Sequence, residues 1–294
     1  MKKLLSALLI LLLAASLPSC APDGGSSGDD TEHPSAVDVD RPTPSVVMTF
    51  EGTKLTTSVQ NSGVTASGST FIISRAGTYE LRGNLTDGQI KVAAGQSSDV
   101  TLVLDGFTAA STTSAPLYIE SANKVDIYLA AGSENGLTDA QTYRFPSPLE
   151  DKPNACLYSA DDLIIRGPGS LTVIGHYNNG IGSRNDLRIR DCTLTVSAPN
   201  NLLKGNDSVE IEGATLTLSG GEDAIKADTT DRPDKGYILI LHGSRLSIDC
   251  ADDAMQATLA ITVEKGAWIT GRCGGDILNS PGIIQADPGS IRMD

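Results

Sequence analysis

The sequence is poor in aromatic residues and in positive charge. Phe, Trp and Tyr together make up 4% of the 294 residues, so flat aromatic surfaces for ligand stacking are scarce. The chain has 22 Lys and Arg against 36 Asp and Glu, and its net charge of −14 repels phosphate backbones and anionic lipid headgroups. This balance argues against nucleic acid as a partner.

The sequence also lacks a long amphipathic helical pattern, which argues against a helical bundle and a nucleotide-binding α/β fold. Its cysteines show none of the close paired spacing of a zinc site. Hydrophobic residues make up 39% of the chain, and there are 30 glycines. This composition supplies enough apolar material for the core of a single elongated all-β domain.

The N-terminal region predicts export and lipid anchoring. A basic start and an apolar run too short for a membrane span indicate a lipoprotein signal peptide over residues 1–19. The segment Leu17-Pro18-Ser19-Cys20 resembles a bacterial lipobox and makes Cys20 the predicted lipidation site; ordinary cleavage, with Cys20 a spare thiol, is the alternative. Residues 20–45, rich in Gly, Ser, Asp and Pro, are predicted to be a flexible tether. We therefore expect a protein of the cell envelope, held at the outer membrane or cell surface.

A repeat of 22 residues organises the predicted domain, residues 46–294. The recurring apolar pairs are Leu187/Ile189 with Leu194/Val196, Val209/Ile211 with Leu216/Leu218, Leu239/Leu241 with Leu246/Ile248, and Ile261/Val263 with Trp268/Thr270. One step of 30 residues contains the polar insert Thr229–Lys235, which we expect to be a loop. Alternation of apolar and polar residues predicts strands, and the fixed pitch favours an all-β parallel β-helix with strands about 4.8 Å apart. A β-sandwich, the alternative, would not keep this pitch.

The repeat register makes further predictions. Trp268 shares a column with Leu194 and Leu216, so we expect it in the core rather than on the surface. Cys250 and Cys273 fall on neighbouring coils, where a disulfide is geometrically possible but two stacked thiols are the favoured interpretation. The less regular residues 46–140 are predicted to form an N-terminal cap and the first coils.

Polar side chains repeat at one turn of successive coils. Carboxylates stacked about 4.8 Å apart repel by about 1 kcal/mol in water and about 3.5 kcal/mol at an effective dielectric constant of 20. Either a hard cation such as Ca²⁺ relieves this repulsion, or the side chains cap turns by accepting backbone hydrogen bonds. We predict calcium at the acidic half of the column and favour capping at the asparagine half, whose side chains remain candidate ligands. The candidate metal ligands are Asp223, Asp252, Asp253, Asp276, Glu222, Asn201 and Asn179.

Basic residues lie beside this column. The register stacks Lys204 on Lys226, with Arg184 nearby. These side chains either pair with Asp207 or Asp228 or contact an acidic or hydroxyl-rich ligand.

Four segments carry a resemblance to a known family: Tyr177–Ile181, Lys204–Val209, Glu222–Asp228 and Asp252–Ala257. They resemble the series NDGI, KGKDSV, GDGIKADN and DDGIQAE of the bacterial carbohydrate-binding domain-containing β-helix family, which is similar in architecture to family-9 pectate lyases. The resemblance implies a right-handed parallel β-helix with about 22 residues per coil, calcium between the coils, and binding to plant-type polysaccharides, including acidic ones. It places calcium at Asp223, Asp253 and Asp276. Asn179, Asn201 and Asn206 depart from the family pattern.

Three functions fit these features. We expect a monomeric, non-enzymatic lipoprotein that binds polysaccharide through Lys204, Lys226, Arg184 and Tyr177, with calcium bridging protein and sugar carboxylates. A calcium-dependent lyase is the first alternative, because β-elimination needs a cation and a base. An acidic corner would keep a lysine protonated and so weakens that alternative. A structural envelope protein whose ligand is another protein is the second alternative.

Overall fold

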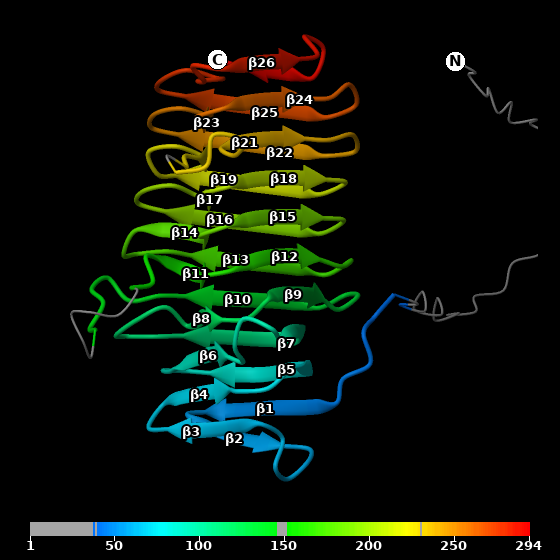
Figure 1. Ribbon diagram of the computed structural model, residues 1–294, viewed down its shortest axis with the longest axis vertical. Coiled ribbons are helices and arrows are strands. Elements are labelled where there is room, and N and C mark those ends of the chain that lie inside the picture. The colour runs from blue at the N-terminus through cyan, green and yellow to red at the C-terminus, as the bar shows by residue number, and fades with distance from the viewer. Residues whose placement is uncertain (1–37, 39, 146–151, 230) are drawn as a thin grey trace, which may run out of the picture. The chain divides into compact units, whose positions relative to one another are not determined.

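The computed structural model describes residues 38, 40–145, 152–229 and 231–294, which form a stack of short strands without a helix (Figure 1). Two sheets, of 18 and nine strands, run through the stack, and their pairings are parallel except in two hairpins near its start. This is a solenoid-like all-β fold, not a sandwich. The described part of the chain contains no helix long and apolar enough to cross a membrane. The predicted signal peptide and Cys20 lie outside the described residues.

The nine-stranded sheet forms one side of every coil. Its strands, in order along the stack, are β3 (Val64–Ser67), β4 (Thr70–Ile73), β6 (Gln89–Ala93), β8 (Leu117–Ser121), β11 (Ala155–Ser159), β14 (Asn179–Ser183), β17 (Leu203–Gly205), β20 (Ile225–Ala227) and β23 (Met255–Ala257).

The larger sheet consists of two rows of paired strands that share the long strand β7. The first row contains β2 (Lys54–Thr57), β1 (Val46–Gly52), β5 (Gly77–Leu85), β7 (Asp99–Ala110), β9 (Lys124–Leu129), β12 (Asp162–Arg166), β15 (Asp186–Arg190), β18 (Ser208–Glu212), β21 (Tyr237–Ile240), β24 (Ala260–Val263) and β26 (Ile283–Ala286). The second row contains β10 (Glu134–Thr138), β13 (Ser170–Ile174), β16 (Thr193–Ala198), β19 (Thr215–Gly220), β22 (Arg245–Cys250), β25 (Trp268–Cys273) and β27 (Ile291–Met293).

The strand register corrects one predicted pair. Val209 pairs with Ile238, 29 residues later, and Ile238 pairs with Ile261, 23 residues later. Ile238 is therefore buried in the core, whereas Leu239 and Leu241, the predicted inward pair, are only half-buried. The prediction was wrong by one residue because the insert shifts the strand after it, and a shift of one residue exchanges the two faces of a strand.

The prediction for Trp268 was also wrong. Trp268 pairs with Arg245, while Ile269 takes the core position opposite Leu246. The Trp268 side chain is 37% exposed, and the Arg292 guanidinium lies 4.2 Å from its ring centroid. The step into this coil is one residue longer than the repeat assumed, and this length brings Ile269 rather than Trp268 into the core column.

The two ends of the stack differ. At the N-terminal end, β2 and β3 pair antiparallel with β1 and β4, and both outer strands are short and polar. Just before β1, within the predicted tether, Arg41 forms ion pairs with Glu80 and Asp105 at 2.8 and 2.9 Å. At the other end Ile283 on β26 is 65% exposed and Ile284 is 44% exposed. The core is thus closed by hairpins at one end only.

Cys250 and Cys273 are in register on β22 and β25, as expected from the repeat. Both are free thiols in the structure. Two stacked thiols without a disulfide are the arrangement that the repeat register favoured.

Candidate functional site

The predicted polar column is present at the turns that precede the short strands of the nine-stranded sheet. Among the residues that the structure describes, three of its side chains accept a hydrogen bond from the backbone amide of their counterpart on the next coil, and Asn201 does not. Asn179 Oδ1 accepts from Asn201 N at 3.1 Å, Asp223 Oδ1 accepts from Asp253 N at 3.2 Å, and Asp253 Oδ1 accepts from Asp276 N at 2.8 Å. The column therefore has the turn-capping arrangement along both its asparagine and its aspartate halves.

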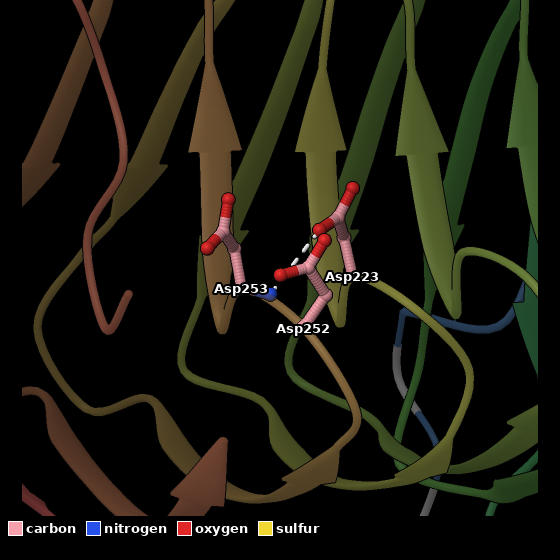
Figure 2. Close-up of side chains that lie close together, drawn as sticks. All are labelled: Asp223, Asp252 and Asp253. Atoms are coloured by element: carbon pink, nitrogen blue, oxygen red, sulfur yellow. Dashed lines mark hydrogen bonds between the residues drawn. The ribbon is translucent and has the colours of Figure 1, made fainter. Parts of the chain in front are cut away.

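Three carboxylates converge at one of these turns (Figure 2). One oxygen from each of Asp223, Asp252 and Asp253 lies within 4.8 Å of the other two. Asp223 and Asp253 are 2% and 4% exposed, and Asp252 is on the surface. The charge of Asp253 is the largest cause that raises the pKa of the Asp252 carboxyl, with smaller contributions from desolvation and from Asp223. The turn thus concentrates negative charge.

Protein donors already contact the second oxygens of the two buried carboxylates. The Lys226 ammonium donates to Asp223 Oδ2 at 2.8 Å. Asn279 Nδ2 and Gln256 Nε2 donate to Asp253 Oδ2 at 2.6 and 3.2 Å. A cation that used these oxygens would have to share or replace these donors.

One buried oxygen near this turn lacks a donor within the part of the chain that the structure describes. Asn201 is 4% exposed, and its Nδ2 donates to Asn179 Oδ1 at 2.9 Å, but its own Oδ1 has no hydrogen-bond partner. Asn201 precedes Asp223 in the column, and a buried amide oxygen without a partner is costly. Amide and carboxylate oxygens are the ligands that Ca²⁺ prefers, so the donor set fits this ion.

The remaining predicted ligands are less suited to a cation. Glu222 and Asp276 are exposed. Asn179 Oδ1 accepts hydrogen bonds from both the backbone and the side chain of Asn201.

The predicted basic residues lie on the outward side of the nine-stranded sheet. Lys204 pairs in register with Gly182 and with Lys226, as predicted. The Lys204 ammonium forms an ion pair with Asp228 at 3.0 Å. Arg184 lines a pocket together with Lys204.

Tyr177 is partly exposed and lies against a second tyrosine. Its side chain is 37% exposed, and its ring stacks on that of Tyr143 with centroids 4.1 Å apart and an interplanar angle of 16°. The predicted exposed aromatic residue is therefore one face of a stacked pair.

The repeat did not reveal that the same column continues toward the N-terminus through aromatic residues. Lys91, Tyr118 and Tyr158 are in register with Gly182 and hence with Lys204. The rings of Tyr118 and Tyr158 are 5.9 Å apart and only 7% and 6% exposed, because they pack with Ala140 and Tyr143 in a small second core. Irregular spacing upstream of residue 160 hid this continuation from the sequence pattern.

Two pockets lie along this column. One, of about 270 Å³, is lined by residues that include Gln89, Lys91, Tyr118, Arg144 and Phe145. The other, of about 190 Å³, is lined by Asn154, Tyr158, Gly182, Ser183, Arg184, Lys204 and Asn206. Both combine basic, amide and aromatic side chains, a lining that suits sugar hydroxyl groups.

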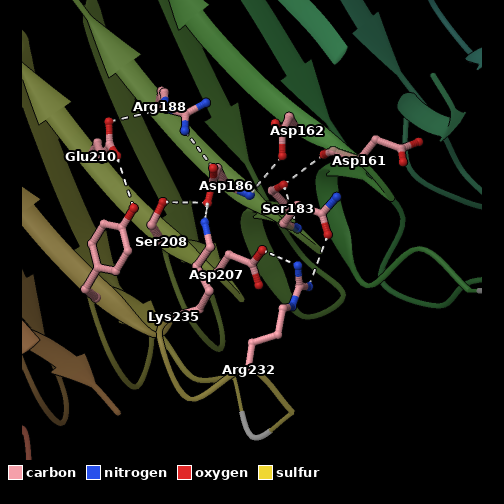
Figure 3. Close-up of polar contacts among 12 residues, drawn as sticks. Asp161, Asp162, Ser183, Asp186, Arg188, Asp207, Ser208, Glu210, Arg232 and Lys235 are labelled. Atoms are coloured by element: carbon pink, nitrogen blue, oxygen red, sulfur yellow. Dashed lines mark hydrogen bonds and ion pairs between the residues drawn. The ribbon is translucent and has the colours of Figure 1, made fainter. Parts of the chain in front are cut away.

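A second set of carboxylates lies at the turn between the nine-stranded sheet and the first row (Figure 3). Asp186 accepts hydrogen bonds from Ser208 at 2.9 Å and Arg188 at 2.6 Å. The insert supplies two more cations: Arg232 pairs with Asp207 at 2.5 Å, and Lys235 lies 3.4 Å from Asp186. At this turn, basic side chains of the protein itself balance the carboxylates.

Comparison with known proteins identifies the family. A family model described as "Carbohydrate-binding domain-containing protein" matches residues 67–281. The chain belongs to this family. It is 39% identical over 281 residues to a carbohydrate-binding domain-containing protein of Acetivibrio thermocellus, and the match covers 96% of both chains. The predicted family is thereby confirmed.

A solved structure supports the same fold. The polysaccharide lyase-like protein from C. thermocellum, studied as a gadolinium derivative, matches with a TM-score of 0.80 and 38% sequence identity. The match covers 85% of this chain and 99% of that chain.

Proposed function

We propose that this protein binds polysaccharide along the outward side of the nine-stranded sheet. The observation that carries the proposal is the register column on one side of successive coils, which consists of Lys91, Tyr118, Tyr158, Gly182, Lys204, Lys226 and Gln256. Strands about 4.8 Å apart present hydrogen-bonding groups at a regular interval, and an extended glycan can follow such a row. Membership of a carbohydrate-binding family supports this assignment.

The chemistry of the column favours polar recognition. Ammonium, amide and guanidinium groups donate hydrogen bonds to sugar hydroxyl or carboxylate oxygens. Ring stacking is limited because Tyr118 and Tyr158 are buried, which leaves Phe145 and Tyr177 as the accessible aromatic edges. We propose that the preferred glycans include acidic, pectin-like polymers.

We propose that binding occurs without catalysis. Lys204, Lys226 or Arg184 could supply the base of a lyase, but the two lysines each lie in an ion pair with a carboxylate. A base for β-elimination must reach the proton of the sugar, and an amine that is engaged by a neighbouring carboxylate is held away from it. The solved relative is described as polysaccharide lyase-like, so lyase activity is the alternative to test. Incubation with polygalacturonate and Ca²⁺ should give no rise in the ultraviolet absorbance of unsaturated products; a steady rise would favour the lyase.

We also propose that Ca²⁺ binds at the turn formed by Asp223, Asp252 and Asp253. The support is the convergence of three carboxylates and the buried, unpartnered Oδ1 of Asn201. The ion would offset the repulsion among the carboxylates and fix the turn beside Lys226. Elemental analysis of the purified protein, with Asp253→Asn as the comparison, tests this proposal: equal calcium content in both proteins would contradict it.

The remaining proposals concern the chain as a whole. Parallel strand crossovers are overwhelmingly right-handed, so we propose a right-handed winding with about 22 residues per coil. We further propose a monomer that is exported and anchored in the cell envelope through a lipid on Cys20. Fatty-acid labelling of the full chain and of Cys20→Ala tests the anchor.

Affinity electrophoresis tests the main proposal. The full chain should be retarded by at least one of polygalacturonate, xylan or soluble cellulose derivatives. Lys204→Met should weaken this retardation, whereas Lys54→Met on the outer hairpin strand β2 should leave it unchanged. No retardation by any glycan would favour the structural envelope protein.

A further inference from the structure

The insert that interrupts the repeat forms one wall of a separate polar pocket. This pocket, of about 350 Å³, is lined by Gln96, Arg184, Asn185, Asn206, Thr229 and Arg232, together with Asp161 and Asp231. It shares Arg184 and Asn206 with the smaller pocket that contains Lys204. The two pockets therefore adjoin.

The insert holds Arg232 in a fixed position at this pocket. Its guanidinium forms an ion pair with Asp207, and its Nη2 lies 3.4 Å from Asn185 Oδ1 (Figure 3). The Asp207 side chain is 4% exposed, and burial is the largest cause that raises its pKa, with the Arg232 charge opposing it. Gly236, directly after the insert, donates its amide to the Asp207 backbone carbonyl at 2.6 Å. The end of the loop is thus tied to the same residue whose carboxylate holds the guanidinium.

The geometry suits an anionic sugar. A guanidinium has five N–H donors in a planar fork, and the Arg232 side chain remains 48% exposed after its contact with Asp207. Arg184 lines the same pocket, and the neutral amides Gln96, Asn185 and Asn206 complete a donor-rich wall. Lys204 is a third basic residue and lies in the adjoining pocket. The described residues that line that pocket include no acidic residue. The lining of the larger pocket combines the two guanidinium groups with two carboxylates, Asp161 and Asp231, whereas the chain as a whole has a net charge of −14.

We infer that the pocket between Arg184 and Arg232 binds the anionic group of a charged sugar residue directly, and that Arg232 of the insert determines the preference for acidic over neutral glycans. This inference rests on the proposed polysaccharide-binding function. It differs from calcium bridging because the guanidinium groups, rather than a metal ion, contact the anion. A uronate carboxylate and a sulfate ester share this chemistry, so both belong in the test.

The experiment compares Arg232→Gln with Arg272→Gln in the full chain. Arg272 is a matched control because it is an exposed arginine, paired with Asp249 on the second row. Binding is measured by affinity electrophoresis against polygalacturonate, a sulfated galactan and neutral xylan, each with and without a chelator. We expect Arg232→Gln to bind one or both anionic glycans at least tenfold more weakly, with xylan binding unchanged and no effect of the chelator.

Several outcomes decide the matter. If the sulfated galactan alone is bound, the anion is a sulfate; if polygalacturonate alone is bound, it is a carboxylate. Unchanged anionic binding in Arg232→Gln, or full loss of binding with the chelator, overturns the inference. Failure of the wild type to bind any glycan would instead overturn the proposed function. Arg232→Lys keeps a charge beside Asp207 if the glutamine variant unfolds, and we expect it to lose part of the anionic preference.

Discussion

Replacement of Lys226 by methionine should tighten cation binding at the acidic turn. The Lys226 ammonium lies 2.8 Å from Asp223 Oδ2, and a cation on the same carboxylate would lie roughly 5 Å from it. A unit charge and a divalent charge at that distance repel by about 1.7 kcal/mol in a medium with the dielectric constant of water. Because about 1.4 kcal/mol corresponds to a factor of ten, removal of the ammonium should lower the Kd for Ca²⁺ by roughly tenfold to twentyfold.

Isothermal titration of the chelator-treated full chain with Ca²⁺ measures this change. Lys204→Met is the matched control, since Lys204 pairs with Asp228 rather than with the acidic turn. The Kd of this variant for Ca²⁺ should stay within about twofold of the wild-type value. Methionine keeps the apolar stem of the lysine, so packing losses are small. Equal or weaker binding by Lys226→Met would refute the idea that this ammonium competes with the cation for Asp223.

Two further predictions concern stability. Leu194→Ala removes a fully buried core side chain and should lower the free energy of unfolding, measured in urea, by about 2–5 kcal/mol. Trp268→Ala should lower it by about 1 kcal/mol, because Trp268 is exposed and mainly contacts Arg292. Equal losses in the two variants would place Trp268 in the core. Burial raises the pKa of the Asp139 carboxyl, so the folded state holds this proton more tightly than the unfolded chain, and its contribution to stability falls as pH rises through the raised pKa. Asp139→Asn should therefore lose less stability than the wild type as pH rises above the pKa of an unfolded aspartate, about 4, and parallel stability curves would contradict this assignment.

The sequence predicted those parts of the fold that repeat without interruption. The column from Asn179 to Asp253 was found because its members keep the same offset from the buried residues of β14, β17, β20 and β23. Predictions failed where a coil changes length: the insert displaced Leu239 by one residue, and a 23-residue step displaced Trp268. Because strand faces alternate, a single additional residue is enough to exchange core and surface.

The site was only partly visible in the sequence. Lys204, Lys226 and Arg184 belong to regular coils and were identified. Arg232 was missed because it lies in the insert, and its partner Asp207 was considered instead as one of two partners for Lys204 and Lys226. No periodic signal connects a loop side chain with the carboxylate of an earlier coil, so only the three-dimensional structure reveals that contact.

The unequal ends of the solenoid set the direction in which such a protein can lengthen. At the N-terminal end, the hairpins β1–β2 and β3–β4 turn the chain back on itself, and an additional coil there would require both turns to be rebuilt. At the opposite end β26 presents an unpaired parallel edge with Ile283 exposed, which offers a template for one more rung. Duplication of a coil in evolution or in design is therefore structurally simplest after β25, where it would extend the row of Lys204, Lys226 and Gln256 by one step without disturbing the residues already in register.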